Sequence, residues 1–244
     1  MKKDNLCYNV NGDFMRLDKF LGNLKYGSRN DIKKLCKDSC VKVNGSIVKK
    51  SDFDIKPGVD EVMVNEEVVF YKENITLMMN KPKGYICSTV DELYPSLLRL
   101  LEDKYLRLDF KFAGRLDWDT EGLVILSTNG DVIHQITSPK KDMYKTYYVK
   151  TKLPVINFDS LEKPITLLDG KNNEYTTKGA KITKISDFEL LVSITEGKFH
   201  QVKRMLEYIN NEVVYLKRIK IGNLSLPEDL NLGEYIEIDL NDIF

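Results

Sequence analysis

From Ile75 onward, segments with the pattern of β-strands outnumber segments with the pattern of helices, and this imbalance restricts the possible folds most strongly. The strand candidates are "ITLMMN", "LVILST", "YKTYYVK", "AKITKI", "ELLVSIT" and "YIEIDL". The helix candidates are "YPSLLRLLEDK" and "HQVKRMLEYI". Several neighbouring strands are joined by short turns, and the sequence contains neither a G-x-G-x-x-G motif nor a P-loop. The pattern predicts an α+β domain with a mixed, largely antiparallel sheet.

Residues 16–50 have a different pattern, which predicts two short helices followed by a tight hairpin. In "RLDKFLGNL" the apolar residues recur on one face of a helix. Ser28 stands three residues before Asp31, which predicts a capping box at the start of the second helix. The segment "VKVNGSIV" alternates about Asn44 and Gly45, a strong hairpin signal. With the further strand in "DIKPGVDEVMV", these elements can form a small separate domain.

The formal net charge of the chain is zero, but the charge is unevenly distributed. Residues 16–50 hold ten lysines and arginines and only three acidic residues, so the remainder of the chain is acidic. Such an asymmetry indicates a module that binds a polyanion, attached to a domain with another task. The alternative is a lysine-rich surface that is only solvated.

The overall composition is that of an ordinary globular protein. Of the 244 residues, 42% are hydrophobic and 30% are charged. No apolar run approaches the roughly 18 residues that a membrane-spanning helix needs, and the N-terminal lysines are followed by polar residues, so we expect a cytoplasmic protein. The four cysteines include no C-x-x-C pair, and we expect reduced thiols that serve in packing.

The stretch "GRLDWDTEGL" places Asp117, Asp119 and Glu121 at alternate positions before the apolar run "LVILST". A calcium loop would need an acidic ligand at its twelfth position, which is Thr128, and a strand occupies the intervening residues. The metal hypothesis therefore fails. Only a residue at the start of the buried strand can be partly buried, so we expect one carboxylate to be chemically special and two to be structural or solvated.

Two further segments carry candidate polar groups. Read as a helix, "EGKFHQVKRMLEYI" buries one apolar stripe and places His200, Lys203 and Arg204 on its other side, near the helix N-terminus. A cation within about 4 Å of a carboxylate would keep it ionised; the alternative is a solvated face. In "YKTYYVK", strand alternation puts Tyr147 on the face of Lys145, where it is either a core residue or a functional one.

Two parts of the chain resemble known families. Residues 15–50 are similar to the RNA-binding domain named after ribosomal small-subunit protein four. The motifs "NKPKGYICST", "GRLDWDTEGL", "SPKKDMYKTYYV" and "EGKFHQVKRML" resemble, in this order, those of the pseudouridine synthases, in the branch that modifies small-subunit ribosomal RNA. The resemblance implies an RNA-binding domain at 15–64, a linker at 65–74 and a catalytic domain at 75–244. Residues 1–14 have no counterpart in the family pattern, and we expect them to form a leader to which we assign no role.

The resemblance also implies roles for individual residues. Asp117 matches the nucleophile of the family, Tyr147 the tyrosine that stacks or abstracts a proton, and Lys203 the basic partner of the aspartate. Arg115 matches the arginine that enters the space left by the displaced base. The residues expected to contact RNA are Arg16, Lys19, Arg29, Lys33, Lys34, Lys37, Lys42, Arg115, His200 and Arg204.

The implied activity is the isomerisation of a uridine to pseudouridine. This reaction breaks the glycosidic bond from C1' to N1 and rejoins the uracil through C5, so a carboxylate must stabilise or trap an electron-poor centre. It consumes no electrons and transfers no group to another molecule, so we expect neither cofactor nor metal. The expected partner is small-subunit ribosomal RNA or its assembly intermediate, bound by a monomer that does not contact membranes.

Two other functions compete with this hypothesis. One is an RNA-binding protein that kept the fold and lost turnover, which the intact set Asp117, Tyr147 and Lys203 disfavours. The other is a glycosidase, which would need a second carboxylate as general acid and gives no reason for the basic N-terminal segment. One departure from the family pattern is Asn210-Asn211 where a glycine usually follows the last helix; asparagine tolerates the left-handed conformation that such a cap requires.

Overall fold

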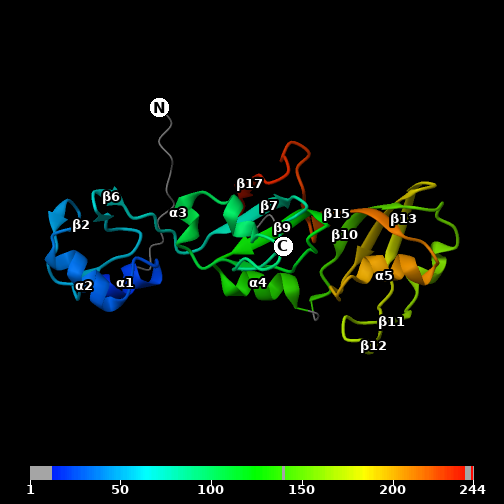
Figure 1. Cartoon of the computed structure of the whole chain (residues 1–244), viewed down its shortest axis with the longest axis horizontal. Coiled ribbons are helices and arrows are strands. Elements are labelled where there is room, and N and C mark those ends of the chain that lie inside the picture. The colour runs from blue at the N-terminus through cyan, green and yellow to red at the C-terminus, as the bar shows by residue number, and fades with distance from the viewer. Residues whose placement is uncertain (1–12, 139–140, 240–242, 244) are drawn as a thin grey trace. The chain divides into compact units, whose positions relative to one another are not determined.

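The computed structural model describes residues 13–138, 141–239 and 243, and the chain divides into two compact units (Figure 1). The first unit comprises Met1–Asn74 and Glu102–Asp109, and the second comprises Ile75–Leu101 and Phe110–Phe244. The expected leader at 1–14 lies almost entirely outside the described residues.

Between residues 13 and 74, the first unit contains two helices and two small antiparallel sheets. Strands β3, β2, β5 and β6 form one sheet in this order, and β1 pairs with β4 to form the other. The elements are β1 (Met15–Arg16), α1 (Leu17–Asn23), α2 (Arg29–Lys37), β2 (Val41–Val43), β3 (Ser46–Ile47), β4 (Asp54–Ile55), β5 (Val62–Val64) and β6 (Glu67–Val68).

Local sequence signals account for most of this unit. The capping box is confirmed, because the Ser28 side chain accepts from the Asp31 backbone and the Asp31 side chain accepts from the Ser28 backbone. The hairpin is also confirmed, since Asn44 and Gly45 take positive φ angles of 49° and 78° at its turn. Part of the expected linker at 65–74 forms β6, which pairs with β5.

The prediction of a single helix over residues 94–104 is wrong. The chain forms a 3-10 helix, η1 (Leu97–Leu100), and a separate short helix, α3 (Asp103–Leu106). Between them Leu101 and Glu102 are extended, with ψ of 148° and 149°. The break has a tertiary cause, because the chain leaves the second unit after Leu101 and buries Tyr105 and Leu108 within the first.

The second unit is built on a nine-stranded sheet, which confirms the α+β class and the largely antiparallel pairing. Its main path runs β13-β14-β10-β15-β9-β7-β17, with β16 paired to β15 and β8 paired to β9. Among the strand pairs that the structure describes, only β9 and β15 are parallel. The strands are β7 (Thr76–Lys81), β8 (Lys111–Phe112), β9 (Glu121–Ser127), β10 (Lys145–Thr151), β13 (Lys181–Ser186), β14 (Glu189–Ile194), β15 (Val213–Ile221), β16 (Leu224–Ser225) and β17 (Tyr235–Glu237).

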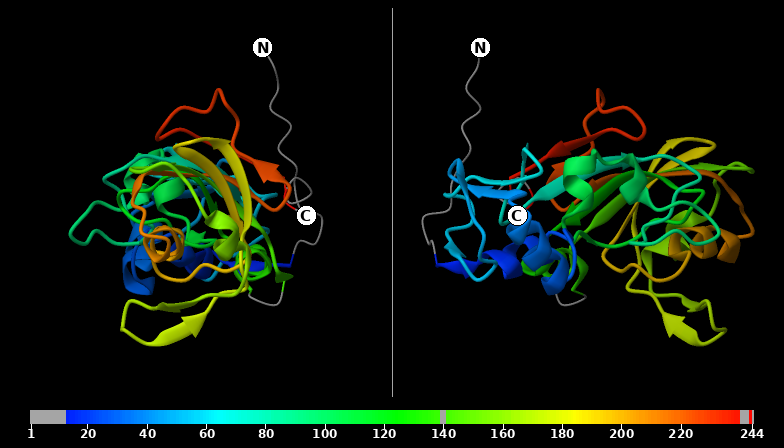
Figure 2. Two further views of the ribbon diagram at one scale, coloured as in Figure 1. Left: turned by 90° about the vertical axis from the view of Figure 1, so that its right-hand side faces the viewer. Right: turned by 60° about the vertical axis from the view of Figure 1, so that its left-hand side comes forward.

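Shorter elements complete this unit. Helix α4 (Gly130–Thr137), which the sequence pattern did not predict, follows β9 and begins at Asn129, whose side chain accepts from the Asp131 backbone. Helix α5 (Gln201–Tyr208) confirms the predicted helix after "EGKF". A hairpin of β11 (Thr166–Leu168) and β12 (Glu174–Thr176), preceded by the 3-10 helix η3 (Phe158–Glu162), projects away from the main sheet (Figure 2).

Strand β9 passes unusually close to β15 at one glycine. Gly122 is paired with Arg218 and has a φ angle of 107°. A β-carbon placed on Gly122 would lie 2.2 Å from the backbone oxygen of Arg218. Glycine is therefore required here for both conformation and space. The pairing of Gly122 with Arg218 therefore fixes the position of the loop that precedes β9 relative to strand β15.

Candidate active site

The loop that carries the three predicted carboxylates joins β8 to β9 and is held by backbone hydrogen bonds. The Trp118 carbonyl accepts from the Gly84 amide at 2.8 Å, and the Asp117 carbonyl accepts from the Thr120 amide at 3.1 Å. The buried Lys81 ammonium donates to the Thr120 carbonyl at 2.9 Å. Burial lowers the pKa of Lys81 to about 8, although nearby acidic groups oppose this shift. The loop is thus fixed to β7 and to the segment after it.

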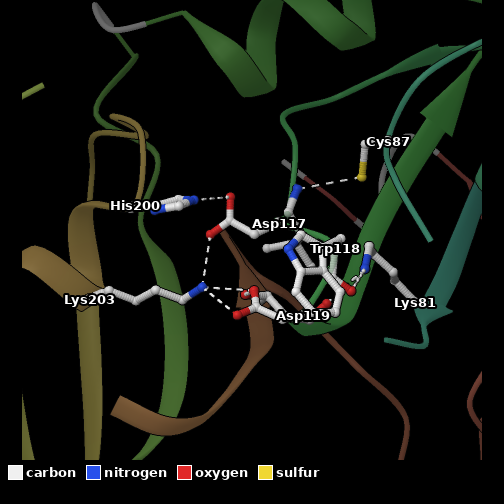
Figure 3. Close-up of polar contacts among 9 residues, drawn as sticks. Lys81, Cys87, Asp117, Trp118, Asp119, His200 and Lys203 are labelled. Carbon is white, nitrogen blue, oxygen red and sulfur yellow. Dashed lines mark hydrogen bonds and ion pairs between the residues drawn. The ribbon is translucent and has the colours of Figure 1, made fainter. Parts of the chain in front are cut away.

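The Asp117 carboxylate points toward two basic side chains at the start of α5 (Figure 3). Its Oδ2 atom lies 3.4 Å from Lys203 Nζ, and its Oδ1 atom lies 3.5 Å from His200 Nε2. The Asp117 side chain is 27% exposed and that of Lys203 is 20% exposed. The expected approach of Lys203 to Asp117 is therefore present, in a partly shielded environment where the attraction between charges is stronger than in water.

Lys203 contacts a second carboxylate more closely. Its Nζ atom donates to both oxygens of Asp119, at 2.7 and 2.9 Å. Burial alone would raise the pKa of Asp119, but the hydrogen bonds and charge of Lys203 outweigh this effect and hold the pKa below its ordinary value. The ionised Asp119 carboxylate therefore holds Lys203 in place. The contact between Lys203 and Asp117 is longer, at 3.4 Å, so it leaves the Asp117 oxygens more accessible to a substrate.

Packing of α5 explains the position of its basic side chains. Val202, Met205 and Leu206 are buried, as the spacing predicts, whereas Ile209 is only half-buried. His200 precedes the helix with a positive φ of 53°, and its ring stacks on Phe199 with centroids 3.7 Å apart. At the other end, Asn210 has a φ of 58°, which confirms the expected left-handed cap.

The third predicted group, Tyr147, lies in the middle of β10. Alternation along this strand is confirmed, because Lys145, Tyr147 and Val149 are buried while Thr146 and Tyr148 are half-buried. Tyr147 lines a pocket together with the other two predicted catalytic residues, Asp117 and Lys203. The residues lining this pocket include Arg115, Asp117, Tyr147, Lys198, His200, Gln201 and Lys203.

The three acidic residues of the loop do not converge on one point. Asp117 and Asp119 face Lys203, whereas Glu121 accepts a hydrogen bond from the Tyr215 hydroxyl at 2.5 Å. Burial and this hydrogen bond raise the pKa of Tyr215. Over the part of the chain that the structure describes, no three histidine, cysteine or acidic side chains are grouped as metal ligands.

Sequence reasoning missed Arg218, which lies beneath the loop. This residue is 1% exposed and donates from Nε to the Leu123 carbonyl at 2.8 Å. Its NH1 atom would lie 3.9 Å from a β-carbon placed on Gly114. Strand β15 was not predicted because lysines and arginine interrupt its apolar residues. The available signal was short, since only Leu216 and Arg218 are buried in alternation, and a register shift against β10 moves the next buried position to Ile221.

The other predicted RNA contacts lie in varied surroundings. Arg115 is exposed on the loop, and Arg204 donates to the Leu168 carbonyl with its guanidinium 5.3 Å from the Phe199 ring centroid. In the first unit, Arg16 pairs with Asp18, and Lys42 pairs with Glu66. The remaining predicted side chains are exposed on helices α1 and α2: Lys19, Arg29, Lys33, Lys34 and Lys37.

Comparison with known proteins identifies the enzyme class to which this fold and pocket belong. Residues 75–208 match the family model of RNA pseudouridylate synthases, and residues 15–60 match that of the S4 domain. The chain belongs to the RNA pseudouridine synthase family, whose members are isomerases, and it carries an S4 RNA-binding domain. Both resemblances drawn from the sequence are confirmed. No helix among the described residues has the length and apolar character needed to cross a membrane.

Several relatives match over nearly their whole length. An uncharacterised RNA pseudouridine synthase of Bacillus subtilis is 39% identical, covering 92% of this chain and 95% of the relative. Ribosomal small subunit pseudouridine synthase A of Haemophilus influenzae is 39% identical, with 94% and 98% covered, and that of Escherichia coli K12 is 37% identical, with 91% and 95% covered. A crystal structure of a pseudouridylate synthase is 38% identical, with a TM-score of 0.65 over 94% of this chain and 98% of that chain.

Proposed function

We propose that this enzyme converts one uridine of small-subunit ribosomal RNA to pseudouridine, with Asp117 as the nucleophile. The observation that carries the proposal is the pocket in which Asp117 lies within 3.5 Å of both His200 and Lys203 and beside Tyr147. The substrate is supported by the names of the relatives in Haemophilus influenzae and Escherichia coli, which are small-subunit enzymes.

The proposed role of Lys203 is to orient the Asp117 carboxylate without occupying its nucleophilic oxygens. Asp119 holds the ammonium at 2.7 Å, so Lys203 is oriented before RNA binds. Its Nζ atom also lies 3.4 Å from Oδ2 of Asp117, close enough to attract and orient that carboxylate. A carboxylate oriented in this way can trap the electron-poor centre that forms when the bond from C1' to N1 breaks.

Tyr147 and Arg115 have supporting roles in the proposal. Tyr147 is buried at the pocket and provides an aromatic surface for the uracil, or a base for the proton at C5. Arg115 is exposed at the pocket edge, from which its long side chain can replace the extruded nucleotide in the RNA. After the uracil turns, C5 bonds to C1' and Asp117 is released as a carboxylate. The hydrogen of C5 leaves as a proton and N1 takes up a proton, so atoms and charge balance.

Loss of the gene tests the substrate. We expect one pseudouridine to disappear from small-subunit ribosomal RNA in cells that lack this enzyme and to return when the gene is restored. Pseudouridine mapping over all ribosomal RNA measures this result. A site lost from large-subunit RNA instead, or no site lost at all, would contradict the proposed substrate.

The basic face of the first unit is proposed to bind RNA phosphates. Replacing Lys33 and Lys37, both exposed on α2, with glutamine should weaken RNA binding and flatten its salt dependence. The slope of log affinity against log salt should fall by about 0.7 to 0.9 for each phosphate that the variant no longer neutralises. Binding titrations at several salt concentrations measure the slope.

Lys184→Gln is the matched control for these two substitutions. Its Nζ atom already bonds to Asp187 at 2.8 Å in the second unit, so the slope should not change. An unchanged slope in the Lys33→Gln, Lys37→Gln variant would remove these lysines from the RNA interface.

A further inference from the structure

An exposed aromatic stack lies beside the proposed nucleophile. Trp118 directly follows Asp117 and stacks on Tyr94, with ring centroids 4.6 Å apart and planes 8° from parallel. The Trp118 side chain remains 46% exposed. Such exposure is unusual for a large apolar ring that serves only to fill a core. Among the residues that the structure describes, Tyr94 is the one ring that stacks against this indole.

The two residues of the stack are held in place before any ligand arrives. The Trp118 carbonyl is bound by the Gly84 amide, and the buried Lys81 ammonium lies 3.5 Å from the same oxygen. On the other side, the segment that carries Tyr94 is fixed because the Ile86 amide donates to the Pro95 carbonyl and the Ser96 amide donates to Asp91. A preformed surface loses little entropy when it binds a ligand.

The Trp118 indole points away from the basic side chains that the Asp117 carboxylate faces (Figure 3). Figure 3 shows the Asp117 carboxylate directed toward His200 and Lys203, and the Trp118 ring directed away from them. Consecutive α-carbons are only about 3.8 Å apart. A nucleotide adjacent to a uridine bound at Asp117 can therefore come within reach of the Trp118 ring.

We propose that Trp118, supported by Tyr94, stacks an unpaired RNA base adjacent to the uridine that enters the pocket. Every base has a flat π-face, so such a platform binds unpaired RNA without demanding one base, and it holds the strand open once the target is extruded. The inference rests on the proposed position of the reacting uridine at Asp117. The inference assigns to Trp118 a role in positioning the RNA, which is separate from the proposed nucleophilic role of Asp117.

Trp118 is the only tryptophan of the chain, so its fluorescence reports directly on the stack. We expect single-stranded oligouridylate to quench this fluorescence in the full-length enzyme. An oligonucleotide of equal length that lacks bases should bind through its phosphates and leave the fluorescence nearly unchanged. Equal quenching by both, or quenching by neither, would overturn the proposal. The same titration with Asp117→Asn separates the two ideas, because stacking does not need the nucleophile.

Kinetics provide the second test. Trp118→Ala should lower kcat/KM by roughly 5- to 150-fold, the range for loss of one base–aromatic stack, mainly through KM, whereas Trp118→Phe should retain most activity. Phe188→Ala is the matched control, because Phe188 is 47% exposed at the turn between β13 and β14. An unchanged kcat/KM in Trp118→Ala, or an equal loss in Phe188→Ala, would contradict the assignment.

Discussion

Asp117→Asn is expected to abolish pseudouridine formation while RNA affinity stays close to that of the unaltered enzyme. The amide has the shape of the carboxylate but carries no charge and is a poor nucleophile, so turnover should fall by about 10⁴-fold or more. Lys203 remains anchored by Asp119, so the pocket should keep its geometry. RNA labelled with tritium at uracil C5 provides the measurement, because each turnover releases that hydrogen.

Asp119→Asn is the informative comparison for this substitution. It lies two residues away and faces the same lysine, but it is proposed to orient Lys203 and not to react. We expect a smaller loss, with turnover that remains measurable. Equal turnover in Asp117→Asn and the unaltered enzyme would end the nucleophile assignment. Failure of the unaltered enzyme to release tritium from any ribosomal RNA would favour a non-catalytic RNA-binding protein.

Gly122→Ala should produce the largest loss of stability among single-methyl changes in the second unit. The added β-carbon would overlap the Arg218 backbone at 2.2 Å, and alanine is strained at a φ of 107°. Together these effects should lower the free energy of unfolding by about 3 kcal/mol or more. Denaturant unfolding followed by fluorescence measures this change, because Trp118 lies in the second unit.

Gly130→Ala adds the same methyl group, but we expect it to increase the stability of the protein. A β-carbon at this first residue of α4 would meet nothing within 4 Å. Alanine also restricts the unfolded chain and favours the helix, so the free energy of unfolding should rise by about 0.5 to 1 kcal/mol. If both alanine variants were equally stable, the close approach of β9 to β15 would not be as tight as the structure shows.

The features predicted correctly from sequence are those that a few neighbouring residues determine. Ser28 and Asp31 form their capping box across three residues, and Asn44-Gly45 forms a turn that needs no distant partner. Tyr147 faces inward because a strand alternates with period two. These signals survive in the folded protein because tertiary contacts agree with them.

The features that sequence reasoning missed depend on residues far apart in the chain. The break near Leu101 follows from the division of the chain between two units, which no local pattern encodes. The pairing of Lys203 with Asp119 joins residues 84 positions apart and decides which carboxylate is anchored. Arg218 was missed for a similar reason, since its partner is the Leu123 carbonyl and not a sequence neighbour. The roles of Asp117, Tyr147 and Lys203 in turnover stay predictions.

The short parallel pairing of β9 with β15 has a consequence for how the enzyme is made. It joins segments about 95 residues apart, which must find each other across a long, flexible stretch of chain. During synthesis, Asp117 leaves the ribosome well before the strand that supports its loop. A nascent chain that ends before Arg218 therefore lacks the strand pairing that holds this loop, and we expect it to be inactive although it carries every proposed catalytic residue.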